Sequence, residues 1–202
     1  MATIYDLKPA FQNLLRPICR WLAERGVTAN QVTLAALALS LIAGAALTLG
    51  MTQSRIFLLL PLVLFLRMAL NAIDGMLARE HHMQSALGAI LNELSDVVSD
   101  VALYLPFALL PAVSPWLVIV LVITALLTEM TGVVAIQIGA SRRYDGPMGK
   151  SDRAFIFGAA ALALGAGAPP GLWLNGLFAV MLALSVATVM NRARHALSEV
   201  AK

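Results

Sequence analysis

Long apolar runs separated by short polar segments constrain this chain more than any other feature. A helix that spans a membrane needs about 20 mostly apolar residues. Six candidate runs occur, the fifth of them short, at roughly 30–50, 55–78, 85–110, 115–140, 153–168 and 171–190. Because lipid cannot satisfy backbone hydrogen bonds, each run is expected to be a helix. The predicted fold is therefore all-α and polytopic, with six transmembrane helices.

The composition excludes several other classes of protein. Hydrophobic residues make up 60% of the chain and charged residues only 12%, whereas soluble domains carry about 25% charged residues. A soluble domain, a disordered chain and a nucleic-acid-binding domain are excluded on this ground, and no nucleic-acid partner is expected. A single cysteine, Cys19, cannot form a disulfide within one chain.

Lysine and arginine lie mostly on one side of the alternating runs, and this bias predicts the orientation. Positive residues concentrate in short cytoplasmic loops. Of the 14 basic residues, Arg67 lies inside a run and Arg55 stands alone on the opposite side. Both termini and the 79–85 and 140–153 connections are therefore expected in the cytoplasm, with the helices in a bacterial inner membrane. The remaining basic residues all lie on the predicted cytoplasmic side: Lys8, Arg16, Arg20, Arg25, Arg79, Arg142, Arg143, Lys150, Arg153, Arg192, Arg194 and Lys202.

The segment before the first run has the pattern of an amphipathic helix. Phe11, Leu14, Leu15, Ile18 and Leu22 recur at helical spacing on one face. An interfacial helix lying on anionic headgroups fits this pattern, while a cationic tail that only sets orientation is the alternative. The predicted domains are the amphipathic helix at 1–26, the transmembrane domain at 27–192 and a cytoplasmic tail at 193–202.

Several polar side chains lie inside the apolar runs, where they are costly. One Asp or Arg at the centre of a spanning helix costs about 2.5–3.5 kcal/mol. Such residues persist when they are paired, face water or bind a metal, so the excess of carboxylates over arginine predicts divalent cations. We expect a structural ion pair between Arg67 and either Asp100 or Glu129. The full set comprises Arg67, Asn71, Asp74, Asn92, Glu93, Asp96, Asp100 and Glu129.

The spacing of these residues brings two stripes together. The second and third runs are joined by a short turn and should pack antiparallel, which makes the stripes face each other. Oxygen-bearing side chains in that position suit hard cations such as Mg²⁺ and leave coordination positions for phosphate. Each stripe follows helical spacing: Arg67, Asn71, Asp74 and Ala78 on the second run, and Gly88, Asn92, Asp96 and Asp100 on the third.

Residues 74–96 read D-G-x2-A-R-x8-G-x3-N-x3-D. This resembles D-x2-D-G-x2-A-R-x8-G-x3-D-x3-D, the signature of the CDP-alcohol phosphatidyltransferase family. The matching positions are Asp74, Gly75, Ala78, Arg79, Gly88 and Asp96. The six runs, the amphipathic start and the Gly-Val-Thr-Ala-Asn entry to the first run are also similar to that family, so the resemblance covers most of the chain.

The resemblance implies an activity and a set of roles. The enzyme would transfer a phosphatidyl group from CDP-diacylglycerol to a small polar alcohol, either free or phosphorylated, and release CMP during phospholipid biosynthesis. One or two Mg²⁺ or Mn²⁺ ions are implied at Asp74, with Asn71 and Asn92 as weakened ligands. Asp96 would be the base and a further metal ligand. The CDP pocket is implied at Asp74, Gly75, Ala78, Arg79 and Gly88, and relatives in the family are commonly homodimers.

This chain departs from the signature at two positions, because Asn71 and Asn92 stand where the family has Asp. An amide oxygen can ligate Mg²⁺ but brings no charge, so metal affinity should fall. Three hypotheses follow. The site holds one tight and one weak metal; Glu93 or Asp100 supplies the missing carboxylate; or the chain is a catalytically silent member that still binds CDP-lipid or metal.

The 141–153 segment concentrates basic residues between the fourth and fifth runs. In the family, basic groups in this region hold an acceptor phosphate, which implies that role for Lys150, Arg153, Arg142 and Arg143. Anchoring by the positive-inside rule is the alternative, especially for Arg142 and Arg143. A small cation transporter would also explain carboxylates in the membrane, but the clustering of the motif on one helix pair disfavours it.

Overall fold

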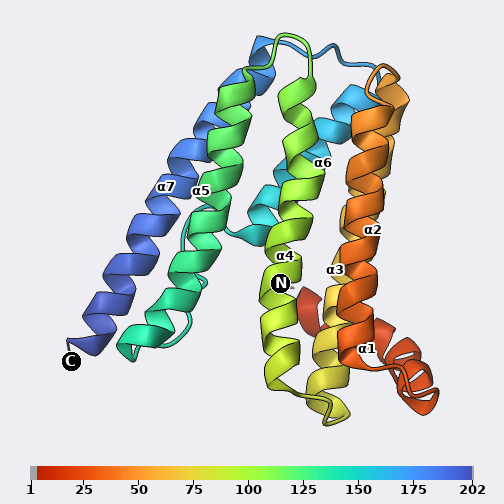
Figure 1. Ribbon diagram of the computed structural model, residues 1–202, viewed down its shortest axis with the longest axis vertical. Coiled ribbons are helices and arrows are strands. Elements are labelled where there is room, and N and C mark those ends of the chain that lie inside the picture. Colours follow the sequence, from red (N-terminus) through yellow and green to blue (C-terminus); the bar gives the residue numbers. More distant parts are fainter. Residues whose placement is uncertain (1–3, 202) are drawn as a thin grey trace.

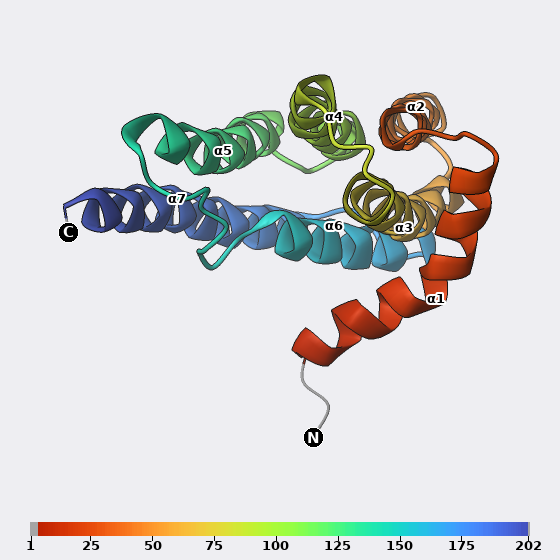
Figure 2. The ribbon, with the colours of Figure 1, turned by 90° about the horizontal axis from the view of Figure 1, so that it is seen from below.

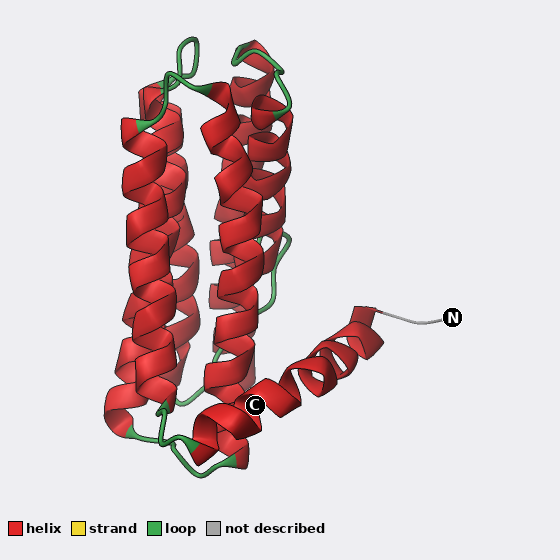
Figure 3. Cartoon of the chain, turned by 90° about the vertical axis from the view of Figure 1, so that its right-hand side faces the viewer, coloured by secondary structure: helices red, strands yellow, loops and turns green. Residues whose placement is uncertain are grey.

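The computed structural model describes the backbone of residues 4–201, which contains helices and no strand (Figure 3). Side chains are described for residues 9–201. Three short 3₁₀ helices adjoin the longer ones: η1 (Ser54–Leu58) before α3, η2 (Leu105–Leu109) after α4 and η3 (Ala135–Ile138) after α5. The α-helices are α1 (Ile4–Glu24), α2 (Ala29–Leu49), α3 (Leu59–Glu80), α4 (Ala86–Tyr104), α5 (Pro115–Val134), α6 (Lys150–Gly165) and α7 (Leu172–Val200).

The helices form two layers (Figures 1 and 2). Figure 2 shows α2, α4 and α5 in one layer and α3, α6 and α7 in the other, with α1 leaving the bundle near α2 and α3. Helix α2 packs against both α3 and α4, while α5 packs against α7. The α3–α4 pair, which carries the motif, therefore lies next to α6 on one side and α2 on the other.

Local sequence signals fix the ends of the helices around the motif. Thr28 caps α2 through a reciprocal capping box with Gln31. Ser85 caps α4 by accepting the backbone N–H of Gly88 at 2.9 Å. The turn between α3 and α4 consequently falls at residues 81–85, where the sequence predicts it.

Four helical segments are long and apolar enough to cross a membrane: Ala29–Leu49, Ser54–Glu80, Pro115–Ile138 and Leu172–Val200. These segments support a membrane protein. Helix α4 carries Glu93, Asp96 and Asp100, and α6 has only 16 residues, so the prediction that these two also span is not confirmed. Helix α7 continues to Val200, and the predicted tail at 193–202 is thus largely helical.

Helix α1 divides its apolar residues between two surroundings. Leu15 and Cys19 are buried against α2 and α3, whereas Leu14 and Ile18 are exposed. Arg16 also forms an ion pair of 2.9 Å with Glu80 at the end of α3. One side of α1 is therefore fixed to the bundle, and its role at the membrane interface stays a prediction.

Aromatic side chains form the core between the two layers. Tyr104 stacks on Phe157 with ring centroids 4.1 Å apart, and Phe107 lies 5.1 Å from the same ring. On the opposite side of α4, the helix approaches α2 so closely that a Cβ at Gly44 would stand 2.3 Å from the carbonyl oxygen of Ala102. These contacts place α4 firmly between α2 and the aromatic core.

The segment 139–149, predicted as a cytoplasmic connection, folds into the bundle. The N–H of Arg143 donates to the carbonyl of Gly132 on α5, and the N–H of Met148 donates to Thr188 on α7. Glycine is required at Gly146, where φ is 129° and a Cβ would lie 2.5 Å from Thr188. Helix α6 consequently begins partway along the bundle rather than at its end (Figure 1).

Candidate active site

Helices α3 and α4 run antiparallel, both packed against α2, and the two stripes that they carry meet where Asn71 contacts Asp96. The side-chain amide of Asn71 donates to Oδ1 of Asp96 at 3.2 Å. Arg67, one turn earlier on α3, donates to the same oxygen at 3.2 Å and to the backbone carbonyl of Asp96 at 2.9 Å. The stripes therefore meet side chain to side chain.

Lys150, the first residue of α6, completes the surroundings of Asp96. Its ammonium contacts Oδ1 of Asp96, which already accepts from Arg67 and Asn71. Of the four basic residues predicted for acceptor binding, Lys150 is the one that touches a motif carboxylate among the described side chains. It does so because the 139–149 segment carries the start of α6 into the bundle.

Asp74 lies on the same side of α3 and is 6% exposed. The hydroxyl of Thr33 on α2 donates to its Oδ2 at 2.8 Å, and Asp74 interacts electrostatically with Asp96 and Lys150. Sequence reasoning did not select Thr33. Its signal was a hydroxyl within an otherwise apolar run, and the same oxygen lies 3.1 Å from the backbone carbonyl oxygen of Ala29.

The other predicted acidic and amide positions on α4 differ from one another. Asn92 is half-buried and, among the described residues, has no side-chain hydrogen bond. Glu93 forms an ion pair with Arg142. Asp100 is buried and receives a 2.6 Å hydrogen bond from Arg67. Glu93 and Asp100, the two acids considered as replacement metal ligands, are thus paired with arginines.

The small residues of the motif make room for Arg79 on α3 and for Asn30 at the start of α2. The guanidinium of Arg79 folds over Gly75, where a Cβ would lie 2.9 Å from Nη2. At Gly88 a Cβ would lie 2.7 Å from the side-chain oxygen of Asn30. Ala78 packs against the apolar cluster shared with α1 and α2. Arg79 itself is exposed and available to an anionic ligand.

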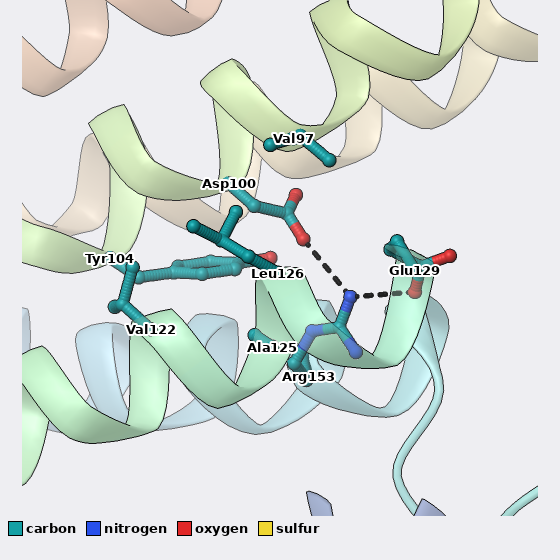
Figure 4. Close-up of a pocket in the computed structure, with 8 residues that line it drawn as sticks. All are labelled: Val97, Asp100, Tyr104, Val122, Ala125, Leu126, Glu129 and Arg153. Atoms are coloured by element: carbon teal, nitrogen blue, oxygen red, sulfur yellow. Dashed lines mark hydrogen bonds and ion pairs between the residues drawn. The ribbon is translucent and has the colours of Figure 1, made fainter. Parts of the chain in front are cut away.

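Beneath these residues lies a buried ion-pair network, shown in part in Figure 4. Arg153 is 1% exposed and bridges Asp100 at 3.3 Å and Glu129 at 3.0 Å. It lines, with Tyr104, a cavity of about 10 Å³, roughly the room that one water needs. Arg153 thus joins α6 to α4 and α5 below the surface, and the Arg67–Asp100 pair continues the network to α3.

Arginines also attach the 139–149 segment to α5 and α7. Buried Arg192 of α7 donates to the backbone carbonyls of Thr128 and Asp145, a role that sequence reasoning missed because only its charge was visible. Arg143 pairs with Asp145 at 2.9 Å and Glu199 at 2.8 Å. Two of the predicted acceptor ligands, Arg142 and Arg143, therefore have protein partners in this structure.

The oxygen donors between α3 and α4 fit the preference of a hard divalent ion. Their donors are the carboxylates of Asp74 and Asp96 and the amides of Asn71 and Asn92, and oxygen donors are what Mg²⁺ and Mn²⁺ prefer. Within the described residues, no group of three or more Asp, Glu, His or Cys side chains could hold a metal. An ion at this place would therefore depend on two carboxylates supplemented by amide oxygens.

Comparison with known proteins agrees with the motif. The family model for CDP-alcohol phosphatidyltransferase matches residues 26–191. The inner membrane protein YnbA of Escherichia coli (strain K12) is 53% identical over 195 residues, which cover 96% of each chain. The match therefore includes the motif helices and the 139–149 segment together.

Solved structures share the fold. Phosphatidylinositol phosphate synthase (PgsA1) of Mycobacterium tuberculosis, in complex with manganese and citrate, aligns with a TM-score of 0.73 over 89% of this chain and 87% of that chain. The same synthase with CDP-DAG bound aligns with a TM-score of 0.69 over 91% and 92% of the two chains. Sequence identity is 22% in both cases, so this similarity concerns the fold.

Proposed function

This chain belongs to the CDP-alcohol phosphatidyltransferase family, and from that premise we propose the reaction that it catalyses. It transfers the phosphatidyl group of CDP-diacylglycerol to the hydroxyl of a small polar alcohol and releases CMP. The inner membrane is the proposed location, with both termini in the cytoplasm and a homodimer as the assembly. A similar fold binds CDP-DAG in the mycobacterial synthase, which supports the choice of donor.

One observation carries the proposal: Asp96 meets Arg67, Asn71 and Lys150 beside the buried Asp74. Carboxylates are expensive in a membrane unless they are compensated. Here Arg67, Asn71 and Lys150 compensate the charge of Asp96. Asp96 and Lys150 both stay partly exposed, so a ligand can still reach them. A carboxylate base beside cationic side chains suits transfer of a phosphate ester.

Donor binding is assigned to the α3 side of the site. Arg79 is exposed at the end of α3 and would contact a phosphate or the cytosine of the nucleotide. Gly75 allows this, because any side chain there would displace the guanidinium. Asp74, held by Thr33, and Gly88 complete the proposed pocket while the acyl chains of the donor remain in lipid.

The transfer step needs a base near the acceptor hydroxyl. The hydroxyl oxygen attacks the phosphorus that bears the diacylglycerol, the bond from that phosphorus to CMP breaks, and Asp96 accepts the hydroxyl proton. Oδ1 of Asp96 is taken by three donors, so the proton is assigned to Oδ2. A bound Mg²⁺ or Mn²⁺, held mainly by Asp74 with the amide oxygens of Asn71 and Asn92, would supply charge neutralisation at the pyrophosphate.

Acceptor binding is assigned to the basic segment that lies against the site. Lys150 faces Asp96, and Arg142 reaches the same side of α4 through Glu93. An acceptor phosphate would compete with Glu93 for Arg142, and Arg143 would follow as part of the same segment. Arg153 would support these groups from below through Asp100.

A catalytically silent protein that binds CDP-lipid or metal is the second candidate. The observation in its favour is the pair of amides at Asn71 and Asn92, which lowers the negative charge available for metal. Retention of both Asp74 and Asp96 favours the enzyme.

The deciding experiment incubates the purified full chain with radiolabelled CDP-diacylglycerol, Mg²⁺ or Mn²⁺ and a panel of acceptors. The panel contains glycerol phosphate, inositol phosphate and free alcohols, and CMP release is measured. We expect release with at least one acceptor. Saturable binding of the CDP-lipid with no CMP release for any acceptor would contradict transfer and select the silent protein.

A further inference from the structure

Lys150 places a positive charge directly against Asp96, one of the two motif carboxylates. Its ammonium contacts Asp96 on α4 and interacts electrostatically with Asp74 on α3. The position of Lys150 is fixed by its surroundings, unlike that of a flexible lysine on the surface. Lys150 is only 31% exposed at its side chain, and its backbone is set by the segment that Met148 fastens to Thr188.

Oδ1 of Asp96 is already saturated in this arrangement. It receives Arg67 and Asn71 at 3.2 Å each as well as Lys150, whereas a carboxylate oxygen offers about two lone pairs. The donor from Asn71 is available because residue 71 is an amide; a carboxylate there would repel Asp96. Asn71 and Lys150 are thus complementary features of the same site.

From this geometry we infer that the ammonium of Lys150 is a built-in cation that takes the place of one divalent ion at Asp96. The chain then binds a single divalent ion, centred on Asp74, rather than two. The charge balance agrees, since two carboxylates and one ammonium leave too little negative charge for two divalent ions. This inference rests on the proposed function and refines its metal requirement.

The physical basis is repulsion between like charges at short range. A second divalent ion at Asp96 would lie next to an ammonium in a partly buried setting, where electrostatic interactions are several times stronger than in water. The ion would have to displace Lys150 from Asp96. Removing the ammonium should therefore favour metal binding, in contrast to the loss expected when an ordinary metal-site residue is removed.

The test measures Mn²⁺ binding alone, without donor or acceptor, on the purified full chain in detergent. Isothermal titration calorimetry gives the stoichiometry and affinity, and electron paramagnetic resonance of free Mn²⁺ gives an independent count. We expect one Mn²⁺ per chain. Lys150→Met keeps the length of the stem without its charge, and should either bind a second Mn²⁺ or bind the first at least about tenfold more tightly.

Two controls keep the measurement specific. Lys150→Arg retains a positive charge and should keep one Mn²⁺. Arg55→Gln removes an exposed charge at the opposite end of the bundle and should behave as the parent chain. The count for the parent chain needs no variant, so the inference remains testable even if Lys150→Met fails to fold.

The outcomes separate this inference from the proposed function. Two Mn²⁺ per parent chain, no Mn²⁺ at all, or unchanged binding in a folded Lys150→Met chain would each overturn the role of Lys150. A chain that binds one Mn²⁺ but releases no CMP with any acceptor would overturn the proposed reaction and leave the built-in cation standing.

Discussion

Arg67 on α3 donates to both the carboxylate and the backbone carbonyl oxygen of Asp96 on α4. The other amino group of the same guanidinium donates to Asp100 at 2.6 Å. One buried side chain therefore fixes the position of the proposed base and the register of the two motif helices. Arg67 therefore both positions Asp96 and stabilises the fold, and a single substitution of Arg67 tests both roles.

Replacing Arg67 with Met should destabilise the fold and impair transfer. Breaking a buried ion pair by removing one partner costs about 3–5 kcal/mol, because the other charge stays buried. Thermal unfolding in detergent should show a clearly lower midpoint, and CMP release should fall. Asp100 keeps its second partner, Arg153, which should limit the loss of stability. An unfolding midpoint equal to that of the parent chain would show that the Arg67–Asp100 pair does not stabilise the fold.

Two glycines form a matched pair for testing the α2–α4 contact. A Cβ at Gly44 would meet the backbone oxygen of Ala102 at 2.3 Å, whereas a Cβ at Gly176 would meet nothing within 4 Å. Gly44→Ala should therefore separate the helices and lower the unfolding midpoint. Gly176→Ala should leave the stability unchanged or raise it by up to about 1 kcal/mol, since alanine favours helix. Equal midpoints for the two variants would contradict the close approach.

Restoring carboxylates at the two amide positions should make the stability depend on metal. Asn71→Asp with Asn92→Asp replaces a donor to Asp96 by a repelling charge and adds metal ligands. Without Mn²⁺ this double variant should unfold at a lower temperature than the parent, and with Mn²⁺ the difference should shrink or reverse. A melting temperature that Mn²⁺ shifts no more than in the parent chain would count against oxygen ligation at these positions.

The 139–149 segment should loosen at acidic pH through Asp145. Partial burial would raise the pKa of this carboxyl, but hydrogen bonds from its own backbone, His195 and Arg143 outweigh burial and hold the pKa below the ordinary value of 3.8. A lowered pKa in the folded state stabilises the fold above the ordinary pKa, and this stabilisation is lost as pH falls through the lower value.

The matching experiment compares the parent chain with Asp145→Asn from neutral pH down to about pH 2, well below the ordinary pKa of 3.8. At neutral pH the variant should be less stable by roughly 1 kcal/mol, the net scale of one ordinary hydrogen bond. Towards pH 3 and below, the gap in unfolding midpoint should narrow. A constant gap across this range would contradict the ionic contribution of Asp145.

The sequence predicts the helices well because each signal is local. Apolar runs, the capping residues Thr28 and Ser85 and the turn before Ser85 all act within a few residues. That the two stripes face each other also follows from helical spacing on an antiparallel pair, although the sequence places Asn71 level with residues 90–93 and not with Asp96. What local signals could not show is the path of residues 139–149, which depends on contacts with α5 and α7.

The sequence shows which charged residues matter, but it does not show which residues they pair with. Charge and cost of burial marked Arg153 and Glu129, but the pairing between them depends on where α6 begins. Arg192 looked like one more basic residue near the end of the chain, although it is buried and holds two backbone carbonyls. Long side chains reach far, so sequence spacing alone does not choose among several partners of opposite charge.

The most direct test of the central claim compares CMP release by the parent chain, Asp74→Asn, Asp96→Asn and a matched control, Glu24→Gln, with CDP-diacylglycerol and an acceptor that the parent uses. Glu24 is exposed at the end of α1 and undergoes the same loss of charge. Both aspartate variants should lose activity by about a hundredfold or more while remaining folded, and Glu24→Gln should match the parent. Folded aspartate variants that release CMP at the rate of the parent would contradict the claim that α3 and α4 together form the catalytic site.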